Sequence, residues 1–293
     1  MASHEHDAAM DVADPEVKKP KSEHESAHGH SHEHADGEEA AKITALGTVT
    51  VGGATFAIDR EGQVESGKTT EFGVELVGAA AAKPHSAWLA NPDGTKVCEP
   101  VSAEEHLSHW HFNVEPLMPV KKSKFVLKVG DEEAIVDWCR GADPCNDGIL
   151  SVFKAVDAPA GGAPMFLELK LHGDAGDLEL FLYERFPISD WKTKGKPAPF
   201  DIPKDSVVTL TFPSHENKSV ELRVRNDKEN EDEDGKPNMR GNGTNYFIFP
   251  GESGQDPEWL KGEKARYNVT VTFQANGKSY AADPFVLVPH EAL

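Results

Sequence analysis

FLELKLHGDAGDLELFL, residues 166–182, contains two runs, Phe166–Leu171 and Leu178–Leu182, in which apolar side chains recur at every second position. A period of two is typical of a strand, because successive side chains of a strand point to opposite faces. Similar runs occur at Thr48–Val51, Thr55–Ile58, Phe72–Val77, Phe125–Val129, Val207–Phe212, Val220–Val224 and Val269–Phe273. Turn sequences interrupt them at Asp93-Gly94, Gly130-Asp131 and Asn276-Gly277. With no long helical period competing, the pattern predicts an all-β fold.

The domain organisation follows from composition. Residues 1–41 carry eleven Asp or Glu against three Lys and few large apolar side chains, so we predict a disordered tail that is rich in histidine and acids. A segment rich in Gly, Ala, Pro and Asp over residues 141–162 predicts a linker. We therefore expect two tandem antiparallel immunoglobulin-like β-sandwich domains, over residues 42–140 and 163–293.

The formal net charge of −20 argues against a nucleic acid partner and favours cations. No stretch approaches the roughly 20 apolar residues of a membrane span, and the N-terminus lacks the pattern of a secretory signal. On this ground alone a cytoplasmic setting stays open.

Histidine is concentrated in the tail, which holds half of the fourteen histidines of the chain. Imidazole is a common ligand for late first-row divalent metals. Histidines at every second position can bind one ion together even in a segment that has no fold. The sequence therefore predicts zinc, copper or nickel binding by His4, His6, His24, His28, His30, His32 and His34.

A second histidine cluster, His106, His109 and His111 with His85 upstream, lies in the first predicted domain. If residues 109–111 are extended, His109 and His111 project from one face and can chelate one ion. Other residues that could complete the shell are Glu104, Glu105 and Cys98. The alternative is that these histidines line a polar rim of the sandwich.

The acidic run over residues 230–238 resembles the front of a calcium loop, with oxygen ligands before a glycine. The candidate calcium ligands are Asn230, Asp232, Asp234 and Asn238. The twelfth position, where a bidentate carboxylate should close the shell, is Gly241. A solvated, charged hairpin loop is the alternative.

Residues 62–69, GQVESGKT, match the glycine and lysine spacing of a phosphate-binding loop. Such a loop opens a helix, whereas Phe72, Val74 and Leu76 alternate after it as a strand does. We therefore interpret this stretch as a polar turn between two strands.

Cys139 and Cys145 suit either a small disulfide-closed loop or two free thiols, and with Cys98 they form an odd set. The local signatures of hydrolases, zinc proteases and dinucleotide enzymes do not occur, so we expect a protein that is not an enzyme.

The stretch Asn226–Gly262 contains NEDEDG (230–235), TNYFIFPG (244–251) and WLKG (259–262). It resembles uncharacterised bacterial envelope-type proteins that join a His-rich leader to β domains. The resemblance covers the second predicted domain best and implies an extracytoplasmic setting, the periplasm or cell envelope, with no known activity.

These observations favour a non-enzymatic protein that binds divalent transition metals for capture or delivery. The rival hypothesis is an interaction module that binds a protein or glycan partner and uses the tail as a solubilising linker. A third hypothesis is an enzyme with a dispersed metal site at His85, His106, His109 and His111.

Overall fold

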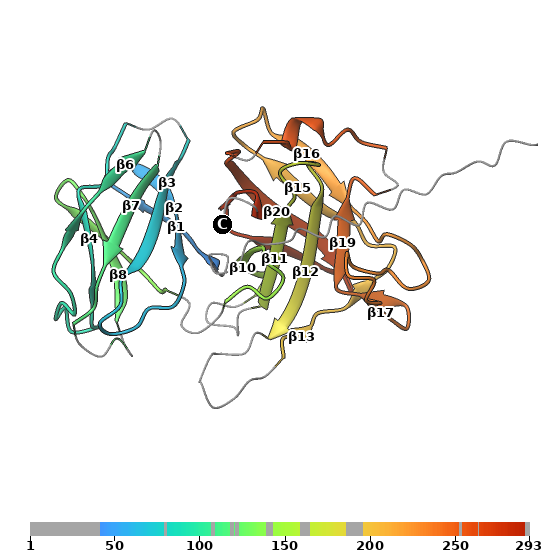
Figure 1. Ribbon diagram of the computed structural model, residues 1–293, viewed down its shortest axis with the longest axis horizontal. Coiled ribbons are helices and arrows are strands. Elements are labelled where there is room, and N and C mark those ends of the chain that lie inside the picture. The colour runs from blue at the N-terminus through green and yellow to red at the C-terminus, as the bar shows by residue number, and fades with distance from the viewer. Residues whose placement is uncertain are drawn as a thin grey trace, which may run out of the picture. The chain divides into compact units, whose positions relative to one another are not determined.

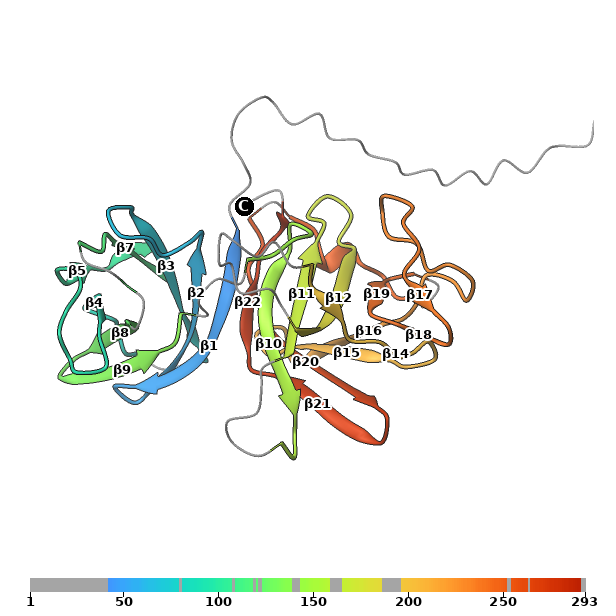
Figure 2. The same cartoon turned by 90° about the horizontal axis from the view of Figure 1, so that it is seen from below.

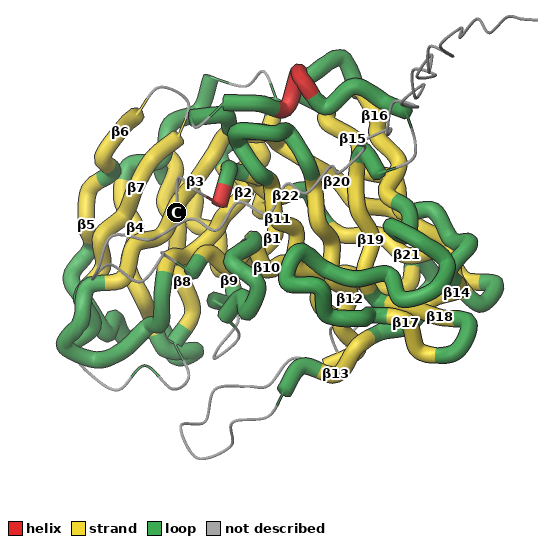
Figure 3. The backbone as a smooth tube through the Cα atoms, turned by 45° about the vertical axis from the view of Figure 1, so that its right-hand side comes forward, coloured by secondary structure: helices red, strands yellow, loops and turns green. Residues whose placement is uncertain are grey.

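The computed structural model describes residues 42–78, 81–106, 109–117, 120, 123–138, 143–158, 165–185, 196–251, 254–262 and 264–290. The predicted tail over residues 1–41, with its seven candidate metal-binding histidines, lies outside the described residues. The described chain is all-β, as predicted, and Glu258–Leu260 add a 3-10 turn, η1 (Figures 1 and 3). Nowhere in these described ranges does a helix have the length and apolar character needed to span a membrane.

Two groups of strands follow each other along the chain (Figure 2). The first group contains β1 (Ile43–Val51), β2 (Ala54–Glu61), β3 (Thr70–Val77), β4 (Ser86–Ala90), β5 (Val101–Ser102), β6 (Glu104–His106), β7 (His109–Val114), β8 (Lys124–Val129) and β9 (Glu132–Val136). The second contains β10 (Ile149–Ala155), β11 (Met165–Leu171), β12 (Leu178–Arg185), β13 (Ala198–Pro199), β14 (Ile202–Pro203), β15 (Val208–Phe212), β16 (Lys218–Leu222), β17 (Met239–Arg240), β18 (Gly243–Thr244), β19 (Tyr246–Phe249), β20 (Tyr267–Ala275), β21 (Lys278–Ala282) and β22 (Phe285–Leu287).

In the first group, the strand order β1-β2-β3-β7-β6 faces a four-stranded sheet, β5-β4-β8-β9, across a hydrophobic core. Phe72 of β3 stacks on Phe125 of β8 with ring centroids 4.3 Å apart, which joins the two layers. Both rings are fully buried. Burial of an aromatic side chain contributes roughly 2–3 kcal/mol, so these two rings stabilise the packing of one layer on the other.

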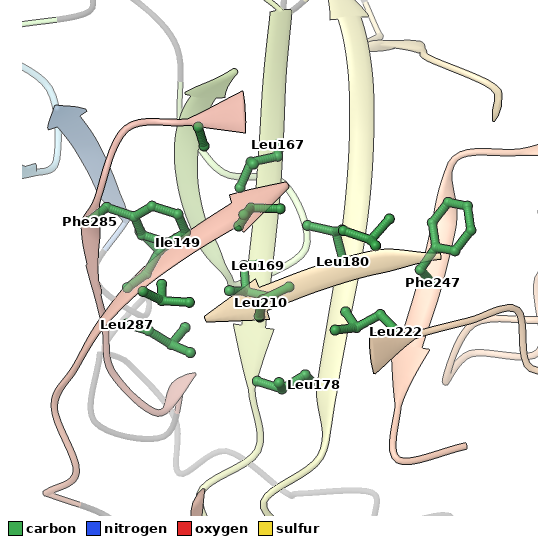
Figure 4. Packing of buried hydrophobic residues seen from close by; sticks show 14 of the residues in the cluster. Ile149, Leu167, Leu169, Leu178, Leu180, Leu210, Leu222, Phe247, Phe285 and Leu287 are labelled. Carbon is green, nitrogen blue, oxygen red and sulfur yellow. The ribbon is translucent and has the colours of Figure 1, made fainter. Parts of the chain in front are cut away.

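The second group has its own core between β10-β11-β12-β19 and β15-β16-β20-β22 (Figure 4). The alternating leucines of the two runs that predicted the fold point into it, and Leu167, Leu169, Leu178 and Leu180 are fully buried. The opposite face of β12 and β19 carries a smaller cluster around Phe181 and Tyr246. Most side chains on both faces of β11 and β12 are therefore shielded from water, although Glu184 and Arg185 at the end of β12 are exposed.

Each predicted run coincides with a strand of the structure over most of its length, although Val207 lies outside β15 and Arg223 and Val224 lie outside β16. The predicted Asn276-Gly277 turn is also confirmed: both residues have positive φ, 52° and 73°, as the tight hairpin between β20 and β21 requires. The stretch that matches a phosphate-binding loop is followed by β3, and Lys68 forms an ion pair with Glu65 at 2.8 Å. Its interpretation as a polar turn before a strand is confirmed.

Two expectations about the organisation need correction. The predicted linker over residues 141–162 contains β10, which pairs with β1, β11 and β21 and buries Leu150 and Phe153. In addition, β1 and β10 pair in parallel, Thr44 opposite Leu150, so the sheets are not made of antiparallel pairs alone. A parallel pair needs a long crossover, and here the whole first group of strands after β1 supplies it. The sequence analysis missed β10 because the residues on either side of it are rich in glycine and proline, a composition that is typical of a linker.

Candidate metal centre

Strand β7 presents two of the predicted histidines on one face. Trp110 and Phe112 are buried in the core of the first group, so the alternation of the strand turns His109 and His111 to the opposite face. Both histidines are half-buried there. The predicted placement of His109 and His111 on one face is therefore confirmed.

The neighbouring strand β6 brings the third histidine to the same face. In the antiparallel pairing, His106 lies opposite His109, and Glu104 lies opposite His111. The ring centroids are 4.9 Å apart for His109 and His111, 5.3 Å for His106 and His111, and 5.8 Å for His106 and His109. We call these three residues, together with Glu71 of β3, the histidine face.

Glu71 orients one of the imidazoles. Its carboxylate is hydrogen-bonded to Nδ1 of His111 across the β3–β7 pair. With the proton on Nδ1, the lone pair of Nε2 is left for a metal ion. A carboxylate behind a metal-binding histidine fixes the ring and raises the basicity of the ligand nitrogen.

Asp59 of β2 lies in the same row, because it pairs with Gly73 of β3, which in turn pairs with His111. The carboxylate fills the space above the glycine, where a Cβ would come 2.3 Å from Asp59 Oδ1. Burial of the carboxyl group raises the pKa of Asp59 to about 6, with Arg266 opposing the shift and Glu75 adding to it. Arg266 forms an ion pair with Glu75 at 3.0 Å, between Nε and Oε2.

The pKa of His109 is lowered to about 4 by burial first, and then by the positive charge of Arg266 and by the other two histidines of the face. Its imidazole is therefore neutral at neutral pH. A neutral imidazole is the form that binds metal ions, so His109 does not need to release a proton before it coordinates.

No protein-family model, curated protein or solved structure matches the chain. The case for function therefore depends on the geometry of the described residues.

Other residues predicted for this cluster lie apart from the histidine face. His85 precedes β4, in the other layer, and its Nδ1 accepts a hydrogen bond from the Gly130 N–H at 3.1 Å. Cys98 is buried in the core, where its sulfur accepts a hydrogen bond from the Leu89 N–H, and burial raises the pKa of the thiol. The suggestion that Cys98 completes the shell is wrong, because its sulfur lies in the hydrophobic core of the first group, where the Leu89 N–H bonds to it.

The acidic loop over residues 226–238 is closed by its own hydrogen bonds. Asn230 is fully buried: its Oδ1 accepts from the Arg225 N–H, and its Nδ2 donates to Thr244 Oγ1 and to the Tyr246 carbonyl. Asp232 Oδ1 accepts from the Lys236 N–H, and Asn238 Nδ2 donates to the other oxygen of Asp232.

These bonds direct the oxygen of Asn230 into the protein, while Asp234 is exposed. Calcium coordination by the four predicted residues stays a prediction, and it would require this hydrogen-bond network to rearrange.

Cys145 is a free cysteine in the structure, and Cys139 lies outside the described residues. The Cys145 sulfur faces the buried carboxylate of Glu168, which also accepts hydrogen bonds from the N–H groups of Cys145, Asn146 and Gly148. Burial of the sulfur and the nearby Glu168 charge raise the pKa of the Cys145 thiol to about 12. The thiol is therefore a poor nucleophile and a poor metal ligand at neutral pH.

One cluster of possible metal ligands was missed by the sequence analysis. Among the described residues, three ligand atoms of His172, Glu179 and Glu233 lie within 4.8 Å of one another. The three residues come from the turn after β11, from β12 and from the acidic loop. Glu179 occupies a polar position between two leucines in one of the runs that predicted the fold. Its sequence spacing from His172 and Glu233 gives no indication that the three residues meet.

Proposed function

We propose that this protein is a non-enzymatic binder of late first-row divalent metal ions, zinc, copper or nickel, and that the histidine face is its folded binding site. The tail histidines would supply further, rapidly exchanging sites. Within the same proposal, the two groups of strands are tandem immunoglobulin-like sandwiches in an extracytoplasmic protein, the setting that the resemblance to envelope-type proteins implies.

The convergence of three imidazoles supports the proposal. His106, His109 and His111 lie within 6 Å of one another by ring centroid, and Glu71 holds the third ring by its Nδ1. Three nitrogen ligands with a carboxylate behind one of them is a common arrangement for zinc and copper. Rotation of the His106 side chain, which is exposed, would bring the ring nitrogens into contact with one ion.

The exposure of the face suits capture or delivery. His106 is exposed and the other two histidines are half-buried, so a bound ion would remain in reach of water and of a competing ligand. The overall negative charge would attract cations to the surface.

Calorimetric titration with Zn²⁺ at neutral pH tests the proposal on the full-length chain. The parent should bind more than one equivalent, and a variant with the seven tail histidines changed to alanine should keep binding at the histidine face. Adding H109A and H111A to that variant should remove this binding, whereas H85A, the matched control, should not. Unchanged binding in the H109A/H111A background would refute the folded site.

Glycan binding is a second candidate, favoured by a groove of about 530 Å³ in the second group of strands. Uncharged hydroxyl and amide side chains line it beside the Tyr280 ring, a combination that suits sugar hydroxyls: Ser206, Thr209, Thr272, Gln274 and Ser279. Titration with neutral oligosaccharides tests this candidate, and T272A together with Q274A should weaken any binding that is found.

A further inference from the structure

His172, Glu179 and Glu233, which we call the His172 cluster, bring one imidazole and two carboxylates together outside the histidine face. His172 Nε2 lies 3.6 Å from Glu179 Oε2 and 3.6 Å from Glu233 Oε2. Both separations are too long for a hydrogen bond. They are close to the roughly 3.3–3.5 Å that separates two ligands of a tetrahedral zinc ion with bonds of 2.0–2.2 Å.

Neighbouring groups fix the two carboxylates so that the oxygens facing His172 are available. The hydroxyl of Tyr246 donates to the other oxygen of Glu179, Oε1, and the ammonium of Lys170 bonds to Oε1 of Glu233. The Glu179 side chain is only 6% exposed, and that of Lys170 is 5% exposed. A carboxylate that is held by one oxygen and buried presents the other oxygen in a defined direction, as a preorganised ligand does.

The imidazole of His172 is also held in place. His172 is the first residue of the turn between β11 and β12. A 2.9 Å hydrogen bond, which the His172 N–H donates to the Asp177 carbonyl, closes this turn. The ring of His290 packs against the imidazole with centroids 4.7 Å apart, and His290 Nδ1 lies 3.1 Å from the Leu171 carbonyl oxygen.

The charges around the cluster are nearly balanced without an ion. Lys170 pairs with Glu233, and Arg225 lies 3.9 Å from Glu179. His172 contributes a positive charge only when it is protonated. The nearby carboxyl group of Asp177, whose pKa is raised mainly by burial and lowered by His172, adds negative charge when ionised.

We propose that Nε2 of His172, Oε2 of Glu179 and Oε2 of Glu233 form a three-ligand site for Zn²⁺, with the fourth position open to water. Glu233 is 47% exposed and lies on the acidic loop, so an ion can enter from that side. The bound ion ties the loop to β12. This site is distinct in ligands and position from the histidine face, and it does not depend on the proposed function.

The test uses the full-length chain with nine histidines changed to alanine, the seven of the tail together with His109 and His111. Calorimetry with Zn²⁺ should find one remaining equivalent, and Co²⁺ in its place should give the visible absorption of a tetrahedral complex. H172Q or E233Q in this background should weaken zinc binding by at least about 100-fold. E229Q, at an exposed carboxylate of the same loop that has no proposed role in metal binding, should leave the affinity unchanged.

If the variant in which nine histidines are changed to alanine binds no zinc, while the parent does, the His172 site is refuted and the proposed function still stands. Zinc binding that H172Q and E233Q do not weaken would also refute the site. Anomalous diffraction at the zinc edge on crystals of the parent gives a second measurement that does not require a variant to fold. A peak between the three ligand atoms supports the site, and zinc bound elsewhere with none there overturns it.

Discussion

The histidine face and the His172 cluster use different chemistry at different depths. The histidine face gathers three imidazoles from two adjacent strands, on a surface where His106 is exposed. The His172 cluster gathers one imidazole and two carboxylates from three separate segments, and Glu179 in it is buried. The first is a local arrangement that a strand and its neighbour are sufficient to form. The second forms only when the folded acidic loop brings Glu233 next to Glu179 of β12.

This difference separates binding from stability. Half-buried imidazoles that stay neutral, as His109 does at neutral pH, cost little to place because they carry no charge that burial would penalise. A buried carboxylate must be paired and hydrogen-bonded, or its charge is strongly unfavourable. We therefore expect substitutions at the histidine face to act mainly on metal binding, and substitutions at the His172 cluster to act on both metal binding and folding.

The largest effect is expected from Glu179→Ala. It would leave Tyr246, Arg225 and His172 without their shared buried partner, and we expect a loss of about 3–4 kcal/mol in the free energy of unfolding without metal. Glu71→Ala, on the histidine face, should cost less than about 1 kcal/mol. Denaturant unfolding of both variants measures the contrast, and equal losses would contradict it.

A somewhat smaller effect is expected from zinc on the histidine face. In the chain without tail histidines, Zn²⁺ at about 100 times its dissociation constant should stabilise the native state by about 2–3 kcal/mol. H109A together with H111A should remove the part of the rise in thermal midpoint that the histidine face contributes. A rise that is the same with and without the two substitutions would assign all of the stabilisation to other sites.

A third, smaller effect is expected from Asp59→Asn. The pKa of Asp59 is about 6 in the folded protein, whereas the ordinary value for an aspartate is 3.8. The folded state therefore binds the proton more tightly than the unfolded chain does. The stability of the parent should therefore fall as the pH rises from about 4 to about 6, and the Asn variant should avoid this loss. Above pH 6 we expect the variant to be more stable by about 1–2 kcal/mol, and below pH 4 the two should converge.

Thermal midpoints measured at pH 3.5, 5 and 7 test this expectation, and Asp157→Asn, at an exposed position, provides the control. A difference between D59N and the parent that does not change with pH would show that the Asp59 charge is not the cause.

The smallest effect is expected from Glu104→Gln, at the exposed residue opposite His111. If Glu71 is the carboxylate that supports the face, this substitution should change zinc affinity by less than about threefold and leave the thermal midpoint unchanged. A tenfold loss of affinity would instead make Glu104 a direct ligand.

Much of the fold was predictable because strand formation leaves a local signature. The alternation in Phe166–Leu171 and Leu178–Leu182 predicted β11 and β12, and the buried leucines confirm which face enters the core. The same reasoning placed His109 and His111 on one face of β7. It missed β10, because Gly and Pro on either side made that segment resemble a linker.

By itself, the sequence determined the all-β class, most of the strands and the shared face of His109 and His111, since each depends on neighbours within a few residues. Only the tertiary structure decided that β1 pairs in parallel with β10, that Asn230 turns inward, and that His172 meets Glu179 and Glu233. The contacts that decide the arrangement join residues far apart in the sequence: Thr44 pairs with Leu150, and Glu233 meets both His172 and Glu179. Their formation depends on how two cores and a loop pack together, which no local pattern of side chains encodes.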